Sequence, residues 1–235
     1  MSDAIVCGFW DAESGLAGIA WALAGASGCV LRRPDETPEV AAAAIAGDDE
    51  PAVRIEAGGE TVEAKLKPRS KPSPLPGFEA EAALVRAAVK GGAVRKAKCE
   101  GYVIRWAADP TEAAGLLRHL ALPAAEDSVL IAISSAEPGA PDHSAEACSA
   151  WLLDPEGGSA AYPEALVSTQ YDAAGLQTRV GVELWSGEDD APPMRGAGTV
   201  AGGATALDGV SAALLDSSVE GHRGAGGYLI WRRQA

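Results

Sequence analysis

Phenylalanine is scarce in this sequence of 235 residues: it occurs twice, and all aromatic residues together make up 5% of the chain. The 47% of apolar residues is therefore mostly Ala, Val and Leu. Tryptophan is the exception, with six copies. A Trp buries a large area and carries an indole N–H that needs a partner, which suits a pocket wall as well as a core. The length is enough for one large all-β domain or two smaller halves that share an interface.

The chain also lacks a basic excess. It has 33 acidic and 19 basic residues, which gives a formal net charge of −14. Proteins that bind nucleic acid use clusters of Lys and Arg to displace the counterions of the phosphates. The basic stretches here, 65–71 and 95–98, are short and are interpreted as solvated strand faces and a linker. We therefore expect no nucleic-acid partner.

The first 31 residues lack the pattern of a targeting segment. Asp3, Asp11 and Glu13 interrupt them, and no basic residue precedes the apolar run. This predicts neither a signal peptide nor a membrane span, so we expect a cytoplasmic protein with no membrane partner.

Residue patterns typical of metal and cofactor sites are absent. The three histidines, His119, His143 and His222, stand alone, with no second ligand at a recognised metal-binding spacing. There is no Gly-x-Ser-x-Gly, and the glycines of 196–203 lack the spacing of a dinucleotide loop. The sequence predicts no metal and no cofactor.

Cysteine pairs are missing as well. Cys7, Cys29, Cys99 and Cys148 lie far apart and form no Cys-x-x-Cys. Buried free thiols are the preferred interpretation, with a disulfide as the alternative.

What the sequence does contain is the signature of β-structure. Two phrases nearly repeat each other, Trp-Asp-Ala-Glu-Ser-Gly-Leu at 10–16 and Tyr-Asp-Ala-Ala-Gly-Leu at 171–176, and each leads into an apolar alternation that ends in Trp. An aromatic residue before Asp and Gly is typical of a strand that enters a tight turn. Residues 53–57 and 61–66 predict a hairpin around Gly58-Gly59. Residues 78–89 and 93–106 predict a longer one around Gly91-Gly92; a helix over 79–89 is the alternative, because Ala, Glu and Leu are good helix formers.

Further strands are predicted over 129–134, 143–153, 165–171, 179–185, 196–204, 209–216 and 227–233. Residues 69–76 contain three prolines and predict a loop, with a linker between independent domains as the alternative. Residues 111–119 predict one short helix capped by Thr111. The fold class is therefore all-β, either an antiparallel barrel or two packed β halves with at most one or two short helices. We expect a first half over 1–108 and a second over 109–235, or one continuous domain.

Alternation assigns faces to two strands. Arg179, Glu183 and Trp185 share one face of their strand, opposite Val180, Val182 and Leu184. This polar face either lines a ligand cavity or faces water. Tyr102, Ile104 and Trp106 form an aromatic-rich face of another strand. This face either packs in the core or lines a cavity.

The chain resembles the lipocalin-like group that includes AttH proteins and carotenoid 1,2-hydratases (hydroxyneurosporene synthases), which is itself similar to calycin barrels. The residues that carry the resemblance are Phe-Trp-Asp at 9–11 with 15–21, Ser-Thr-Gln-Tyr-Asp at 168–172 through Trp185, and Gly-His-Arg-Gly at 221–224 leading to Trp231. Members of the group contain two lipocalin-like halves. The resemblance implies an apolar-ligand cavity, and hydration, cyclisation or isomerisation of an isoprenoid-like compound; none of the group's catalytic residues maps onto this chain.

The preferred hypothesis is a cofactor-free β-barrel protein that binds a hydrophobic small molecule, isoprenoid-, steroid- or polyketide-like. Five residues are the candidate ligand-binding set: Trp21, Tyr102, Trp106, Arg179 and Trp185. Any reaction of the ligand would use general acid–base catalysis, with His143 and Glu183 as the candidate catalytic residues. A buried carboxylate or histidine has a perturbed pKa, which suits such a role. The alternative is a non-catalytic acidic β-protein with a solid interior that acts by binding another protein.

Overall fold

The computed structural model describes residues 4–232 except 24, 49, 109–115, 125–126, 137–144, 157, 174–176, 189–190, 203–204 and 208, and only the backbone at 116, 136, 145–146, 205–207 and 232. Every regular element in this part is a β-strand, and every strand pair is antiparallel. The predicted all-β antiparallel fold is confirmed. The described residues include no helix of the length and hydropathy that a membrane span needs.

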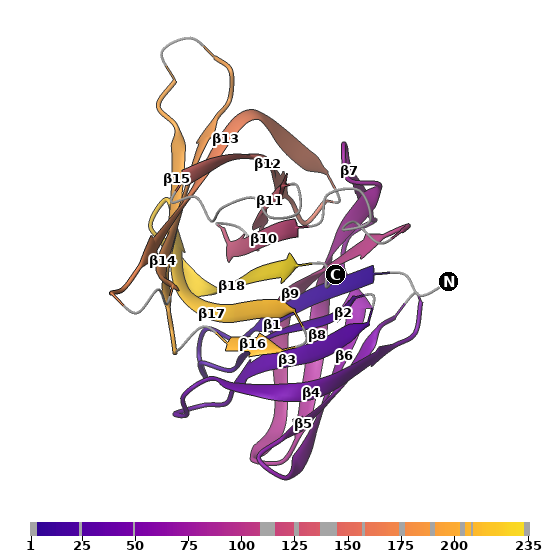
Figure 1. The fold of residues 1–235 in the computed structure, drawn as a ribbon. Coiled ribbons are helices and arrows are strands. Elements are labelled where there is room, and N and C mark those ends of the chain that lie inside the picture. The colour runs from indigo at the N-terminus through magenta and orange to yellow at the C-terminus, as the bar shows by residue number, and fades with distance from the viewer. Residues whose placement is uncertain are drawn as a thin grey trace.

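The first nine strands form a closed barrel (Figure 1). They are β1 (Ala4–Trp10), β2 (Ala17–Leu23), β3 (Ala26–Arg32), β4 (Glu39–Ala46), β5 (Ala52–Ala57), β6 (Glu60–Pro68), β7 (Ser73–Leu75), β8 (Ala80–Gly91) and β9 (Val94–Trp106). Successive strands pair from β1 to β6, and β9 pairs with both β1 and β8. Pairing of β6 with β8 closes the ring, and β7 extends it beside β8.

The second barrel repeats this topology. Its strands are β10 (Leu116–Pro123), β11 (Val129–Ala136), β12 (Ala145–Leu153), β13 (Ser159–Tyr171), β14 (Gln177–Trp185), β15 (Met194–Val200), β16 (Thr205–Leu207), β17 (Val210–Val219) and β18 (His222–Arg232). β10 occupies the place of β1, β18 that of β9, and pairing of β15 with β17 closes the ring. The chain therefore consists of two barrels of eight strands, one over each half.

Alternation along the strands fills each barrel with apolar side chains. In β1, Ile5, Cys7 and Phe9 point into the first barrel together with Ile55 of β5 and Leu66 of β6, and all five are 0–5% exposed. Leu122, Val182 and Leu215 occupy the same position in the second barrel. The ring of Phe9 lies over Gly18, where a Cβ atom would come within 2.4 Å of it.

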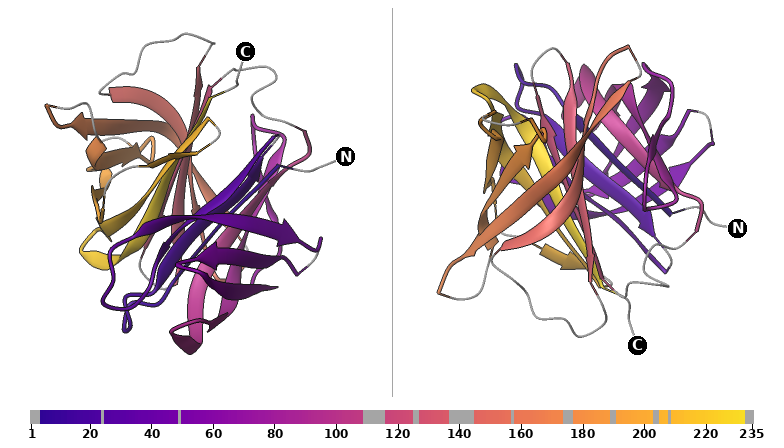
Figure 2. Two further views of the ribbon diagram at one scale, coloured as in Figure 1. Left: turned by 60° about the horizontal axis from the view of Figure 1, so that its bottom comes forward. Right: turned by 90° about the horizontal axis from the view of Figure 1, so that it is seen from above.

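The two barrels pack side by side through the opposite faces of their central strands (Figure 2). β17 contacts β2 and β3, β18 contacts β1 and β2, and β12 contacts β8. We call the apolar layer between them the interbarrel cluster; it includes Val6, Ile19, Trp21, Leu84, Tyr102 and Trp106 of the first barrel and Leu117, Ile131, Trp151, Leu214, Leu229 and Trp231 of the second. Four of the six tryptophans thus lie between the barrels.

Ion pairs connect the barrels at the rim of this layer. Arg32 bonds Asp216 at 2.7 Å, and Arg69 bonds Asp127 at 2.6 Å while a second nitrogen of its guanidinium holds Glu100 of its own barrel at 2.6 Å. The Arg32–Asp216 and Arg69–Asp127 contacts join residues 184 and 58 positions apart in the chain and fix one barrel against the other.

Two local predictions were wrong. A helix was expected over 111–119, but Leu116 to His119 belong to strand β10, which pairs with β11 on one side and with β18 on the other. Residues 111–115 lie outside the described residues. Tertiary pairing overrides the helix propensity of Leu here. The loop expected over 69–76 contains β7, in which Pro74 is tolerated because β7 is an edge strand with one side free of the ladder.

Both glycine-centred hairpins are confirmed. Gly58 and Gly59 have φ of 58° and 80° and connect β5 to β6, and Gly91 and Gly92 connect β8 to β9. The echo between 10–16 and 171–176 also lies at two hairpins, β1–β2 and β13–β14. Those hairpins do not occupy equivalent places, because β13 and β14 correspond to β4 and β5 of the first barrel. The similarity between these two segments therefore does not mark equivalent positions of the two barrels.

Candidate functional site

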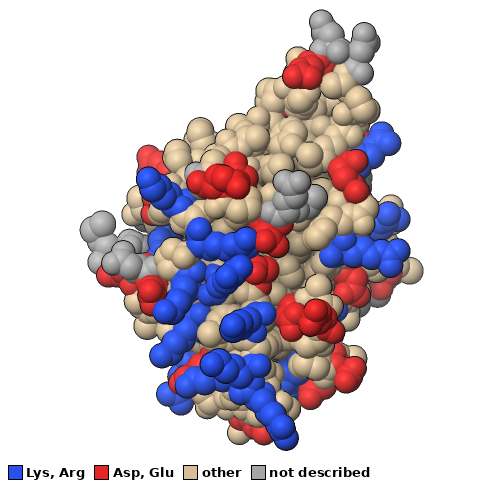
Figure 3. Space-filling view, turned by 180° about the vertical axis from the view of Figure 1, so that it is seen from behind, with Lys and Arg blue, Asp and Glu red and all other residues tan. Residues whose placement is uncertain are grey.

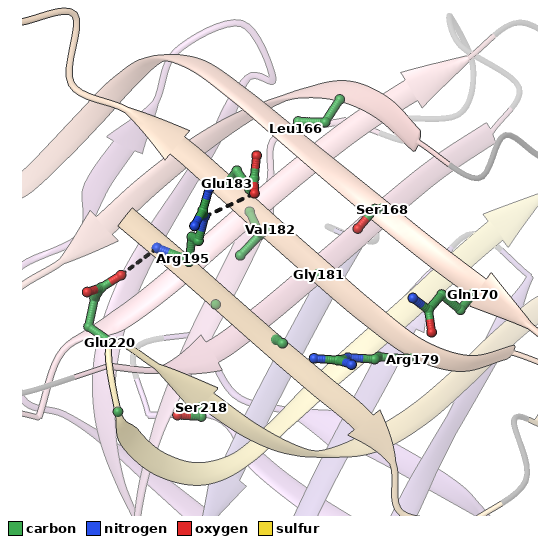
Figure 4. A pocket seen from close by; sticks show the side chains of 13 residues that line it. Leu166, Ser168, Gln170, Arg179, Gly181, Val182, Glu183, Arg195, Ser218 and Glu220 are labelled. Carbon is green, nitrogen blue, oxygen red and sulfur yellow. Dashed lines mark hydrogen bonds and ion pairs between the residues drawn. The ribbon is translucent and has the colours of Figure 1, made fainter. Parts of the chain in front are cut away.

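A groove of about 820 Å³ lies on the outer face of the second barrel. Strands β13, β14, β15 and β17 form it, and the turn from β17 to β18 closes one end (Figure 4). Its lining residues are Leu166, Ser168, Gln170, Arg179, Gly181, Val182, Glu183, Arg195, Gly196, Ala197, Ser218, Glu220 and Gly221. Small molecules are usually bound in hollows of roughly 300–1,000 Å³.

Small residues create the depth of the groove. Gly181 and Ala197 pair across β14 and β15 and face the groove, whereas Gly196 beside them contributes only backbone, because a Cβ atom there would point at Leu122, Val182 and Val219 of the barrel interior. A Cβ atom at Gly181 would lie 2.8 Å from the hydroxyl of Ser168, so any larger residue there would narrow the groove. Its floor is therefore backbone and short apolar side chains.

Charged groups stand along both sides of this floor. Arg195 donates from Nε to Glu183 at 3.1 Å, and its backbone N–H donates to Glu220 at 2.6 Å. Glu220 has φ of 47° in the turn after β17, a conformation that brings its carboxylate back over β15. Both carboxylates on the groove thus have a cationic or N–H partner. Arg179 has no ion pair within the described part of the chain, so its guanidinium is available to a ligand.

The groove continues into a second hollow of about 540 Å³ at the junction of the barrels. Arg179, Ala197 and Ser218 line both. The second hollow adds Arg223 of β18 and the Arg32–Asp216 pair, with Asp11 from the first barrel. Arg179 therefore lies where the two hollows meet, and Arg223 is the second unpaired cation among the described lining residues.

The structure brings two of the predicted site residues together. Arg179 and Glu183 share the outer face of β14, opposite the buried Val180, Val182 and Leu184, as the alternation predicts. Trp185 follows on the same strand, half-buried, and does not line the groove. His143 lies outside the described residues.

The other predicted residues are elsewhere. Trp21, Tyr102 and Trp106 are 1–2% exposed and belong to the interbarrel cluster. Trp106 also borders a separate hollow of about 820 Å³ beside β7, with Leu75 and Ala80. The residues predicted as one ligand-binding set thus divide between the outer groove and the layer between the barrels.

The interbarrel cluster holds a buried histidine that sequence reasoning left aside. His119 of β10 is 0% exposed, and its ring lies 5.6 Å from that of Tyr102 of β9. Neither of its nitrogens has a hydrogen-bond partner in the described structure, nor has the hydroxyl of Tyr102. Burial lowers the pKa of His119 to about 3 and raises the pKa of Tyr102 well above its ordinary value. His119 is therefore neutral at physiological pH.

Sequence reasoning missed most of the groove. Arg195, Glu220 and Gln170 carry no motif, and they line one groove only because β13 pairs with β14, β14 with β15 and β15 with β17. The one available signal was the alternation that placed Arg179 and Glu183 on a polar face. Among the described residues no cluster of His, Cys, Asp and Glu could hold a metal ion.

Comparison with known proteins agrees with this architecture. No family model matches the sequence, and no curated protein matches it. The structure is similar to a crystal structure from Nitrosomonas europaea described as a putative AttH (NE1406), with a TM-score of 0.62 over 98% of this chain and 92% of that one. The chain has an AttH-like fold. Sequence identity is 14%, so the likeness extends to the fold alone.

The AttH-like fold confirms the resemblance that the sequence suggested, including the two-barrel organisation. A β-barrel of this kind is compatible with ligand binding. In this chain, however, the described interior positions of the first barrel are occupied by side chains 0–8% exposed. The hollows described above lie on the outer face of the second barrel, at the junction of the barrels and beside β7.

Proposed function

We propose that this protein binds a small amphipathic molecule, with an apolar body and one anionic group, in the outer groove of the second barrel. The observation that carries the proposal is Arg179, which has no ion pair among the described residues and lies at the junction of two connected hollows with a floor of Gly and Ala. The apolar body would lie on Leu166, Ala197 and the backbone of Gly181, and the anion would bind the guanidinium of Arg179, a donor well suited to carboxylate and phosphate.

The proposal keeps the hydrophobic ligand that the sequence predicts but moves it from a barrel interior to an outer face. Isoprenoid and fatty acids, steroid carboxylates and other amphipathic acids fit the description. Glu183 is engaged by Arg195 and its side chain is 40% exposed, so we assign it to fixing the wall of the groove. Acid/base catalysis by Glu183 stays a prediction from the sequence.

Titration calorimetry with a long-chain carboxylate and the alcohol of the same chain length tests the proposal. The carboxylate should bind saturably and the alcohol at least tenfold more weakly, because a charge-assisted hydrogen bond contributes about 1.5–3 kcal/mol. Arg179→Gln should abolish this preference, whereas Arg54→Gln, an exposed arginine on β5 of the other barrel, should retain it.

A second variant separates shape from charge. Gly181→Val keeps a strand-forming residue on β14 and fills the groove beside Ser168. It should weaken binding of the acid and the alcohol alike. Equal binding by wild type, Arg179→Gln and Gly181→Val would contradict the proposal.

A further inference from the structure

A basic surface stands out on this acidic protein. Residues 109–235 contain six basic and 18 acidic residues, whereas residues 1–108 contain 13 of the 19 basic residues. Figure 3 shows Lys and Arg side chains gathered on one face of the molecule. The outer faces of β6, β8 and β9 supply this surface, which we call the basic platform: Lys65, Lys67, Arg86, Lys90, Lys96 and Lys98.

Strand register places these cations in rows. Lys65 pairs with Ala88 on β8, which pairs with Lys98 on β9, so two lysines flank one alanine. In the next row Lys67 lies directly opposite Arg86. Like charges directly opposite each other destabilise a sheet. The platform therefore carries an arrangement that folding alone does not favour.

Acidic residues neutralise only part of the platform. Arg86 pairs with Glu100 at 3.4 Å and Lys90 with Glu63 at 3.2 Å. Lys65, Lys67, Lys96 and Lys98 have no ion pair within the described residues and are exposed. The lysine stems rise from a scaffold whose alternate residues, among them Leu66 and Val85, fill the first barrel. Four lysine charges are thus fixed on a rigid face and left to an outside partner.

The character of the platform favours a fluid anionic surface over a macromolecule with a defined shape. Protein interfaces are depleted in lysine and depend on aromatic and arginine anchors, and the platform residues include five lysines and no aromatic. Single-stranded nucleic acid is held by aromatic stacking, which is absent from these six residues as well. The platform measures about 10 Å across three strands and about 13 Å along β6. A nucleic acid longer than that would run onto the acidic flanks.

We infer that the basic platform docks the protein on a membrane surface rich in anionic lipid. The Debye length is about 10 Å at moderate salt, so acidic residues of the second barrel that lie farther than this from the bound surface repel it only weakly. Mobile headgroups adjust to fixed lysines, and each lysine near such a surface strengthens binding roughly fivefold. The contact is peripheral and electrostatic. It revises the expectation of no membrane partner and is independent of the groove.

Vesicle co-sedimentation tests the inference. The intact protein should sediment with vesicles of equal parts phosphatidylcholine and phosphatidylglycerol at low salt, and neither with pure phosphatidylcholine vesicles nor at high salt. The triple variant Lys65→Gln/Lys67→Gln/Lys98→Gln should bind the anionic vesicles on the order of 100-fold more weakly. Its melting temperature should be unchanged or slightly raised, because it removes like-charge repulsion.

The matched control adds three acidic residues at exposed positions of β13: Ser159→Glu/Ala160→Glu/Ala161→Glu. Both triple variants lower the net charge by three, so only a local contact separates them. Wild-type affinity of the control confirms docking through the platform. Equal loss in both variants, equal binding to neutral vesicles, or binding to duplex DNA in place of vesicles would overturn the inference.

Discussion

Ile19 of the first barrel packs directly on Gly227 of the second. A Cβ atom at position 227 would lie 2.8 Å from the Cδ1 atom of Ile19, and both residues face the interbarrel layer. Gly227 is thus the place where β18 lets a side chain of the other barrel approach its backbone. The two barrels share one core through contacts of this kind, so the interface should contribute to the stability of the whole chain.

Gly227→Ala is expected to destabilise the protein by about 1–3 kcal/mol, because overpacking forces neighbouring side chains to shift. Equilibrium urea denaturation measures the change. In the Ile19→Ala background the same substitution should cost clearly less, since the Cδ1 atom is gone. Equal costs in both backgrounds would show that Gly227 acts through its own backbone and not through Ile19.

His119 should make the protein sensitive to acid. Its pKa is lowered to about 3 in the folded state by burial, whereas an unfolded histidine titrates near 6.5. The unfolded state therefore takes up the proton first, and stability falls as the pH drops from about 6.5 towards 3, by roughly 1.4 kcal/mol for each pH unit.

The variant His119→Phe should flatten that part of the stability curve. Urea denaturation between pH 7 and pH 4 measures it, and the carboxylates contribute equally to both proteins. His222→Ala, at an exposed histidine, should keep the wild-type slope. A wild-type slope in His119→Phe would contradict the burial of a neutral histidine between the barrels.

Arg69 should matter more to stability than other charged residues. It holds Glu100 and Asp127 together across the barrels, with 21% of its side chain exposed. Arg69→Ala is expected to lower the free energy of unfolding by about 1 kcal/mol, and Arg54→Ala, whose side chain is 65% exposed, by less than about 0.5 kcal/mol. Chemical denaturation in low and high salt measures both. The reverse ranking would contradict the interbarrel role of Arg69.

The reactivity of the cysteine thiols should show whether the interior of the first barrel is closed to a reagent. Cys7, Cys29 and Cys99 are buried free thiols, as the sequence predicts, and burial raises the pKa of Cys7 to about 12. Thiolate is the reactive form, so these three should react with a thiol reagent only on unfolding. Cys148 is partly exposed and should react first. Cys148→Ser should remove the fast phase; a fast phase that persists would contradict the packed interior.

Sequence reasoning reached the fold because its signals are local. The Gly-Gly pairs at 58–59 and 91–92 determine two hairpins, and alternation in β14 separates Val182 from Glu183 correctly. It failed where the neighbouring strands determine whether a segment forms a helix or a strand. Leu116 and Leu117 are good helix formers, and only their neighbours on β11 and β18 make them strand.

The equivalence between the barrels shows a subtler limit. Gly-Tyr-Val-Ile-Arg-Trp at 101–106 and Gly-Tyr-Leu-Ile-Trp-Arg at 227–232 are equivalent in sequence and lie on the equivalent strands β9 and β18. Tyr102 faces the interbarrel cluster, whereas Tyr228 faces the interior of its own barrel. A shift of one residue exchanges the faces of a strand. The face of the strand on which a residue of a repeated motif lies therefore depends on the register of strand pairing. This register cannot be read from the sequence.

The groove could not be predicted for the same reason. Glu183 and Arg195 are 12 positions apart and meet through the pairing of β14 with β15, and Glu220 reaches Arg195 through the pairing of β15 with β17. A polar strand face was visible in the sequence, but whether it lined an interior or an outer face depended on the direction in which the sheet closes.

Chemical-shift mapping of the amide resonances during titration with a long-chain carboxylate tests the central claim most directly. We expect saturable shifts of Gly181, Gly196 and Ala197 and of the Arg179 side chain, with the interior residues Ile55 and Leu66 unchanged. Shifts centred on the interior of a barrel, or no saturable shift with any amphipathic acid, would contradict ligand binding in the outer groove.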